Sequence, residues 1–228
     1  MTDAPRRERA RLYLITPPKI DDVSAFKAIL MQALDAGDVA CLQLRLKDGG
    51  QIDADATRAV ADAVMEGVQS KDIAVIINDS VDLALELGAD GIHVGAMDAS
   101  VAEARRRLGP EAIVGATCKS SRHIAMEAGE AGADYVAFGS FYPTKTKDDA
   151  TPADPEILEL WQESMELPCV AIGGITPSNA EPLVRAGADF LAVSSGIWAH
   201  PEGASAAVAQ FNGMFDRLHA QWATDQVD

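Results

Sequence analysis

The sequence predicts an α/β protein, a (β/α)8 TIM barrel that occupies residues 1–228 as one domain. Three observations support this: short apolar runs recur along the 228 residues, amphipathic patterns separate them, and several helix-to-strand connections share one form. Strict alternation of strand and helix favours parallel strands, and eight such units suit a closed barrel of this length. An open, doubly wound sheet is the alternative. Residues 1–9 are expected to form a loose tail.

Eight apolar runs are rich in Val, Ile and Leu and are short, as strands buried on both faces should be. Amphipathic segments such as "DVSAFKAILMQALDAG", with apolar residues at helical spacing, fill most of the gaps. Before three of the apolar runs, the end of an expected helix is followed by Gly-Ala-Asp: "GADGIHVG", "GADYVAFG" and "GADFLAVS". The expected strands are residues 11–17, 39–47, 74–79, 91–95, 112–118, 135–141, 168–174 and 190–198.

The composition excludes several classes of protein. A formal net charge of −16 argues against a nucleic-acid surface, which is normally basic. No apolar run approaches the roughly 18 residues of a membrane helix, and the first residues lack the pattern of a secretory signal. Cys41, Cys118 and Cys169 each lie in an apolar run and are expected to be buried and reduced. We therefore expect a cytoplasmic protein with neither a nucleic-acid nor a membrane partner.

The second expected strand ends in the polar pattern "QLRLK". Because side chains alternate along a strand, Gln43, Arg45 and Lys47 share one face and the intervening leucines share the other. Functional side chains of such barrels gather at the carboxyl ends of the strands, so we expect the polar face to point inward there. Two inward-facing cations about 7 Å apart repel each other unless an anion lies between them. This end of the barrel is therefore predicted to bind an anion.

Two carboxylates follow neighbouring strands. Asn78 and Asp79 end the third expected strand, and Asp98 follows the fourth. Carboxylates on adjacent loops beside cations suit Mg2+ that also holds phosphate oxygens. Loop aspartates are also common turn residues, so the metal hypothesis depends on the cations around them.

Further phosphate-binding groups are expected at three other loops. The seventh expected strand ends in "AIGGIT" and the eighth carries "AVSSGI", so backbone N–H groups around Gly174 and Ser195 can approach a phosphate. The sixth strand leads into "FYPTKTK", in which Thr144, Thr146 and Lys147 carry hydroxyl and ammonium donors. Two anion sites and a metal indicate two phosphorylated substrates, or one diphosphate and one monophosphate.

At this point the sequence resembles a known family, thiamine phosphate synthase, as a divergent member and over residues 11–198. The resemblance depends on "QLRLK", "IINDSVDLALELGADGIHVGAMD", "GADYVAFGSFYPTKTK", "AIGGITPSN" and "GADFLAVSSGI", which occur in the family's order and at similar spacing. It implies a Mg2+-dependent transferase that couples hydroxymethylpyrimidine diphosphate to hydroxyethylthiazole phosphate and yields thiamine monophosphate and pyrophosphate. Both partners are small molecules, and a homodimer is left open.

The resemblance also implies residue roles. The departing diphosphate gathers negative charge as its carbon–oxygen bond breaks, and cations stabilise that charge more than the ground state. The implied catalytic residues are Arg45, Lys47 and Lys147. The implied metal ligands are Asp79 and Asp98. The implied substrate-binding residues are Gln43, Arg45, Lys47, Asn78, Thr117, Thr144, Thr146, Lys147, Gly174 and Ser195.

Some positions depart from the family's usual residues, among them Ala96, Thr117, Lys119 and Ser140. Two alternatives therefore stay open. One is a thiazole tautomerase-like isomerase that releases no pyrophosphate, and the other is a protein that binds thiamine precursors or phosphates without turnover. His93, inside the fourth expected strand, is predicted to be a packed, hydrogen-bonded interior residue and not a base.

Overall fold

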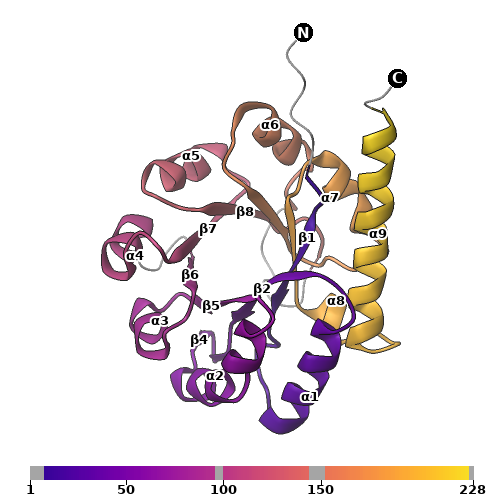
Figure 1. Cartoon of the computed structure of the whole chain (residues 1–228). Helices are drawn as coiled ribbons and strands as arrows, with labels where there is room; N and C mark the ends of the chain where they lie inside the picture. Colours follow the sequence, from indigo (N-terminus) through magenta and orange to yellow (C-terminus); the bar gives the residue numbers. More distant parts are fainter. Residues whose placement is uncertain (1–7, 96–99, 144–151, 226–228) are drawn as a thin grey trace.

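Eight parallel strands close into a barrel in the order β1-β10-β9-β8-β7-β6-β5-β2, in a computed structural model that describes residues 8–95, 100–143 and 152–225. Helices surround the strands, and the long α9 lies along one side of the barrel (Figure 1). β1 pairs with both β10 and β2, so the sheet has no open edge. The predicted (β/α)8 barrel is therefore confirmed, and the open sheet is excluded.

The elements follow one another along the chain as predicted, with additions between them. The barrel strands are β1 (Arg11–Ile15), β2 (Val39–Leu44), β5 (Ala74–Asn78), β6 (Gly91–Val94), β7 (Ile113–Lys119), β8 (Tyr135–Gly139), β9 (Cys169–Ile172) and β10 (Phe190–Val193). A separate hairpin contains β3 (Lys47–Asp48) and β4 (Gln51–Ile52). The helices are α1 (Val23–Leu34), α2 (Ala54–Gln69), α3 (Val81–Leu87), α4 (Val101–Leu108), α5 (Arg122–Glu130), α6 (Glu156–Ser164), α7 (Glu181–Ala186), α8 (Ser195–Trp198) and α9 (Ala204–Asp225).

The first five helices begin at side chains that cap them. In each, an Asp or Ser oxygen accepts a hydrogen bond from a backbone N–H of the first turn, which would otherwise lack a partner. These caps fix where the loops at the carboxyl ends of the strands stop. The capping residues are Asp22, Asp53, Ser80, Ser100 and Ser121.

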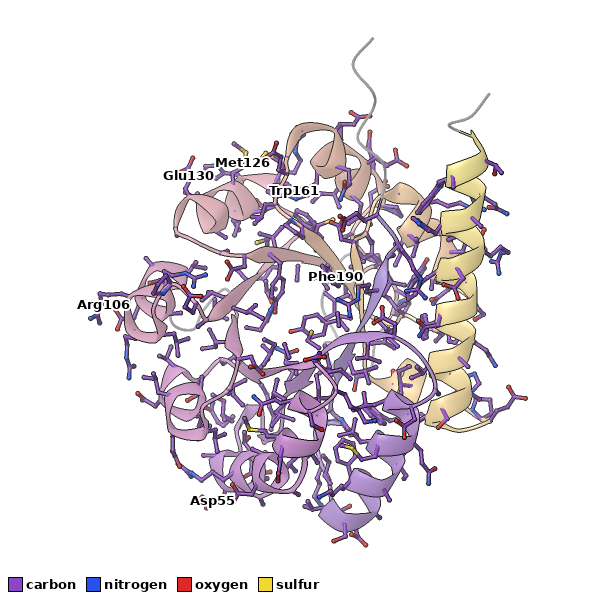
Figure 2. The ribbon with its side chains drawn as sticks, viewed as in Figure 1. Asp55, Arg106, Met126, Glu130, Trp161 and Phe190 are labelled. Atoms are coloured by element: carbon purple, nitrogen blue, oxygen red, sulfur yellow. The ribbon has the colours of Figure 1, made fainter. Side chains whose placement is uncertain are left out.

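Alternation along the strands creates two separate cores. The larger core is aliphatic and lies between strands and helices; Trp161 of α6 is fully buried in it (Figure 2). Charged residues such as Asp55 and Arg106 extend from the outer surface in the same view. The smaller core fills the barrel interior with Tyr13, Ile15, Cys41, Ile76, Tyr135, Ala137, Val170 and Ala192. Gln43, Asn78 and His93 are also buried, so the interior includes polar side chains.

Most of the expected strands are longer than the observed ones, and in two of them the extra residues belong to another element. Residues 39–47 contain β2 to Leu44 and Lys47 of β3; between them, the backbone N–H of Arg45 donates to a side chain, Oγ1 of Thr16, at 2.9 Å. Residues 190–198 contain β10 to Val193 and then α8, so Ser195 lies in a helix and not in a strand.

The predicted N-terminal tail reached residue 9, but Arg9 contacts α9. Its guanidinium donates to Asp216 at 2.7 Å and to the side chain of Asn212 at 2.8 Å. Arg9 is therefore part of the folded structure. Among the described helices, none combines the length and apolar character needed to cross a membrane.

Candidate active site

Polar side chains from β2, β3 and β5 meet at the carboxyl end of the barrel. Nε2 of Gln43 donates to Oδ1 of Asn78 at 3.0 Å, and the Asn78 amide donates in turn to Oδ2 of Asp79. Nζ of Lys47 donates to the same carboxylate oxygen at 3.0 Å. We call Gln43, Lys47, Asn78 and Asp79 the Asp79 cluster. Four of the residues singled out by the sequence are thus in one connected group.

Asp79 adopts a backbone conformation that few residues other than glycine adopt. Its φ is 62°, in the left-handed region, where non-glycine residues are uncommon and often functional. Its backbone N–H donates to the carbonyl of His93 at 2.8 Å, and its Oδ1 accepts from the N–H of Gly95 at 3.1 Å. Contacts with β6 and the loop after it therefore fix the direction of this carboxylate.

Arg45 lies beside the Asp79 cluster as a partly buried cation. Burial lowers the pKa of its guanidinium, and the charge of Asp79 partly opposes that shift. No carboxylate in the described part of the chain is within ion-pair distance of Arg45, whereas Lys47 is paired with Asp79. A buried charge costs free energy unless an opposite charge compensates it, so this position suits an anionic ligand.

The donor set at this end is compatible with Mg2+. Magnesium takes oxygen ligands and needs only one or two protein carboxylates when substrate phosphates supply the rest. Asp79 offers one carboxylate, held in place by its neighbours. Within residues 8–95, 100–143 and 152–225, no three His, Cys, Asp or Glu side chains lie close enough together to form a metal site. Asp98, the second predicted ligand, lies outside the described residues.

Thr117 is hydrogen-bonded to the ring of His93, and the backbone carbonyl of His93 accepts from the N–H of Asp79. Oγ1 of Thr117, which is partly exposed on β7, lies 2.8 Å from Nε2 of His93. Nδ1 of His93 lies 3.0 Å from the hydroxyl of Tyr135. Burial lowers the pKa of His93 to about 4, so its ring is neutral near pH 7. The prediction of a packed, hydrogen-bonded histidine is confirmed.

Sequence reasoning missed Tyr13 and Tyr135, whose hydroxyls lie 2.8 Å apart in the barrel interior. One signal could have identified them: both occupy inward-facing positions of their strands. Tyr13, for example, lies between Leu12 and Leu14, which face the outer core. A tyrosine inside a barrel must find a partner for its hydroxyl, so polar neighbours were to be expected.

The loops after β8 and β9 are in close contact. Gly174 has a φ of 63°, and a Cβ added to it would lie 2.5 Å from the carbonyl oxygen of Pro143. The backbone N–H of Tyr142 donates to the carbonyl of Gly173 at 3.1 Å. The chain that enters the "TKTK" segment is therefore anchored on the β9 loop. The predicted residues Thr144, Thr146 and Lys147 lie outside the described residues.

Ser195 is exposed as the first residue of α8. It lines a cavity of about 470 Å3, together with Thr176 after β9 and His200 after α8. Gly174 and Ser195 thus lie in the two loops where this fold commonly binds phosphate. Among the described residues, no hydrogen bond or ion pair links Ser195 to the Asp79 cluster.

A second cavity, of about 550 Å3, lies at the amino ends of β5, β6 and β7. Its lining includes Asp72, Asp90 and Glu111. Carboxylates repel a phosphate at neutral pH, so this opposite end of the barrel does not suit the predicted substrates. The carboxyl end, with Arg45 and Lys47, is the candidate active site.

Comparison with known proteins gives the family. The model of the family described as thiamine monophosphate synthase matches residues 12–197. The chain belongs to this family. The thiamine-phosphate synthase of Hyphomonas neptunium is 61% identical over 220 residues, which cover 96% of this chain and 100% of that protein. The one from Rhodospirillum centenum is 61% identical over 202 residues, covering 89% of this chain and 96% of the relative.

A solved structure agrees with this membership. The thiamine phosphate pyrophosphorylase from Pyrococcus furiosus superposes with a TM-score of 0.77 at 29% identity, over 92% of this chain and 97% of its own. The resemblance seen in the sequence motifs is therefore confirmed at the level of family and fold.

Proposed function

We propose that this chain is an enzyme that joins hydroxymethylpyrimidine diphosphate to hydroxyethylthiazole phosphate, forming thiamine monophosphate and releasing pyrophosphate. Family membership supports this proposal. The observation in the site that carries it is Arg45, a partly buried cation beside the Asp79 cluster with no carboxylate partner among the described residues. A diphosphate would supply the missing negative charge.

The diphosphate would lie between Arg45 and Lys47. Both cations act most strongly when the leaving group gains charge, because they are already oriented and partly shielded from water. The amides of Gln43 and Asn78 would orient the pyrimidine diphosphate, and their mutual hydrogen bond keeps both side chains in place. Lys147 would add a further charge at the departing pyrophosphate. No protein nucleophile is required, since the thiazole nitrogen itself attacks the vacated carbon.

Asp79, together with Asp98, would hold Mg2+. When bound, the metal supplies positive charge to the diphosphate oxygens. Asp79 is oriented for this task by the backbone N–H of Gly95, and Lys47 balances its charge.

The second substrate would place its phosphate at the loops after β8, β9 and β10. Gly174 would offer its backbone N–H, and Ser195 offers an exposed hydroxyl. Thr144 and Thr146 would complete this side. The cytoplasmic location expected from the sequence remains a prediction.

One reaction mixture separates this function from its alternatives. The protein is mixed with both phosphorylated precursors and Mg2+, and thiamine monophosphate and pyrophosphate are quantified. The synthase forms both products in equal amounts. A tautomerase releases no pyrophosphate, and a binding protein retains the precursors unchanged; either result contradicts the proposal.

Asp79→Asn tests the metal assignment. Asparagine tolerates the left-handed backbone, so the fold should survive, but the variant loses the charge that holds the metal. We expect Mg2+-dependent turnover to fall by on the order of a hundredfold or more, since a bound metal is worth several kcal/mol to such a transition state. The measurement is the turnover rate across a Mg2+ titration.

Asp82→Asn is the matched control for this substitution. Asp82 is an exposed residue of α3, and its carboxylate pairs with Arg107. It should retain wild-type turnover and metal dependence. Equal behaviour of the two variants would defeat the metal assignment.

A further inference from the structure

A line of hydrogen bonds crosses the barrel interior and ends at Thr117. The hydroxyls of Tyr13 and Tyr135 are 2.8 Å apart, the Tyr135 hydroxyl is 3.0 Å from Nδ1 of His93, and Nε2 of His93 is 2.8 Å from Oγ1 of Thr117. The four residues come from β1, β8, β6 and β7. Tyr13, Tyr135 and His93 are buried, whereas Thr117 is partly exposed. The line therefore leads from the closed interior to the candidate active site.

Gly115 makes this arrangement possible. A Cβ at residue 115 would lie 1.9 Å from Cζ and 2.3 Å from the hydroxyl oxygen of Tyr135. The Tyr135 ring thus occupies the space that a side chain on β7 would fill, two residues before Thr117. Its centroid is 5.6 Å from that of the His93 ring. The missing side chain at residue 115 leaves room for the Tyr135 ring, whose hydroxyl lies 3.0 Å from Nδ1 of His93.

The relative strengths of donors and acceptors determine which group donates in the hydrogen bond between Tyr135 and His93. Burial raises the pKa of Tyr13 and of Tyr135 well above their usual value, so both keep their O–H groups. A phenol is a stronger donor than an imidazole N–H, and an imidazole nitrogen is a stronger acceptor than a phenol oxygen. Tyr135 therefore donates to Nδ1. In a neutral ring the proton then lies on Nε2, because the bond at one nitrogen sets the state of the other.

The consequence reaches Thr117. When Nε2–H donates to Oγ1, the threonine hydroxyl has accepted a bond and its own hydrogen is available for another acceptor. If Nε2 carried no proton, the Thr117 hydroxyl would donate to it. Thr117 would then have only lone pairs left for the substrate. Phosphate oxygens are acceptors, so only the first arrangement attracts a phosphorylated substrate.

We propose that Tyr135 is a positioning residue which, through His93, sets Thr117 as a hydrogen-bond donor to an anionic oxygen of the substrate. The benefit to turnover rests on the proposed function, since it requires a phosphorylated substrate at the carboxyl end. The state of the His93 ring does not depend on it.

The His93 tautomer is the first test. The protein is labelled with 15N in its 4 histidines, and the His93 signals are assigned by their loss in His93→Gln. Nitrogen chemical shifts should show the proton on Nε2 at pH 7. Tyr13→Phe removes a hydroxyl one link farther away, and should keep that tautomer. A proton on Nδ1 in the wild-type protein would overturn the proposal, whatever the activity.

A double-mutant cycle is the second test. Thr117→Val removes the hydroxyl and should lower kcat/KM by on the order of tenfold to a hundredfold, as expected for a lost hydrogen bond to a charged group. Tyr135→Phe keeps the ring and should lower it by about tenfold. If Tyr135 acts through Thr117, the double variant is no worse than Thr117→Val alone. Independent, multiplying losses would show a purely structural role and refute the proposal.

Two further measurements distinguish failure of the positioning role from failure of the proposed function. Thr117→Ser retains the hydroxyl, so Tyr135→Phe should still cost about tenfold in that background. The same cycle is also measured as affinity for pyrophosphate with Mg2+ by titration calorimetry, which needs no turnover. Coupling in binding without any product would sustain the positioning role and defeat the proposed function. Additive binding losses would defeat the positioning role itself.

Discussion

At the scale of single residues, burial determines the charge of the histidine in the site. His93 has hydrogen-bond partners at both ring nitrogens, and burial lowers its pKa to about 4. The charge of Asp79 opposes this shift and that of Arg45 adds to it. A neutral ring can accept and donate at once, which a protonated ring cannot.

This shift predicts a pH-dependent stability. The unfolded chain protonates His93 near pH 6.5, whereas the folded protein does so only near pH 4. Stability from this residue is thus complete above about pH 6.5 and is lost as the pH falls towards 4, by about 2 kcal/mol between pH 7 and pH 5. Urea unfolding at pH 7, 6 and 5 measures it, and His93→Gln should show a shallower loss than the wild-type protein. A His93→Gln variant that kept the wild-type slope would show that burial of His93 is not the cause of this pH dependence.

Several site residues could be predicted from the sequence, because side chains alternate between the two faces of a strand. "QLRLK" predicted that Gln43, Arg45 and Lys47 face away from the leucines, and the leucines are indeed in the outer core. The predicted barrel placed Asp79 on a loop beside the cations, but the sequence could not show that Asp79, 32 residues away, pairs with Lys47 directly. The hydroxyl line through Tyr135 was not predicted, although the inward-facing positions of Tyr13 and Tyr135 indicate that each hydroxyl needs a polar neighbour.

At the scale of the element, β7 combines two features that serve the site. It carries a glycine where the Tyr135 ring crosses it, and its pairing with β8 shifts between Thr117 and Lys119. Lys119 has a φ of 53°. The strand is thus regular around Gly115 and departs from regular pairing only at the carboxyl end, beyond Thr117.

Gly115→Ala should damage both the fold and the site. The added methyl group would overlap the Tyr135 ring, and overpacking of this kind costs about 1–3 kcal/mol. Displacement of the ring also breaks its contact with His93. Gly213→Ala, in an exposed part of α9 with no atom within 4 Å of the added carbon, is the matched control and should stabilise by about 0.5–1 kcal/mol. Urea unfolding compares them, and equal effects would contradict the crowding.

The elements that the sequence predicted are those long enough to show a pattern. All eight barrel strands fall within the predicted apolar runs or within one residue of them. The β3–β4 hairpin and α8 were missed, since strands of two residues and a helix of four are too short for a periodicity to appear. Tertiary contacts define them, such as the hydrogen bond from Nε1 of Trp198 to the carbonyl of Ile15 at 2.7 Å.

At the scale of the whole molecule, the closed barrel shields its thiols. Cys41 faces the interior, while Cys118 and Cys169 belong to the outer core. Burial raises the pKa of Cys118 and of Cys169 to about 12, and that of Cys41 still higher. The reactive thiolate is therefore scarce at all three positions.

The folded protein should accordingly resist thiol reagents. In buffer at pH 8, we expect no measurable reaction of the 3 cysteines with a disulfide reagent over the time in which the urea-unfolded chain reacts completely. Absorbance of the released thiol measures both. Rapid modification of one cysteine in buffer would show that the barrel opens locally at that strand.

The two cores of this barrel differ in how well they tolerate substitutions. Aliphatic side chains between strands and helices can be exchanged for others of similar volume at little cost, as in most protein interiors. The inner layer of Gln43, Asn78, His93 and Tyr135 cannot, since its side chains hydrogen-bond to one another and to their neighbours. Selection for heat resistance would therefore change residues of the outer core. Replacing the polar interior with aliphatic side chains would give a more stable protein that has lost its candidate active site.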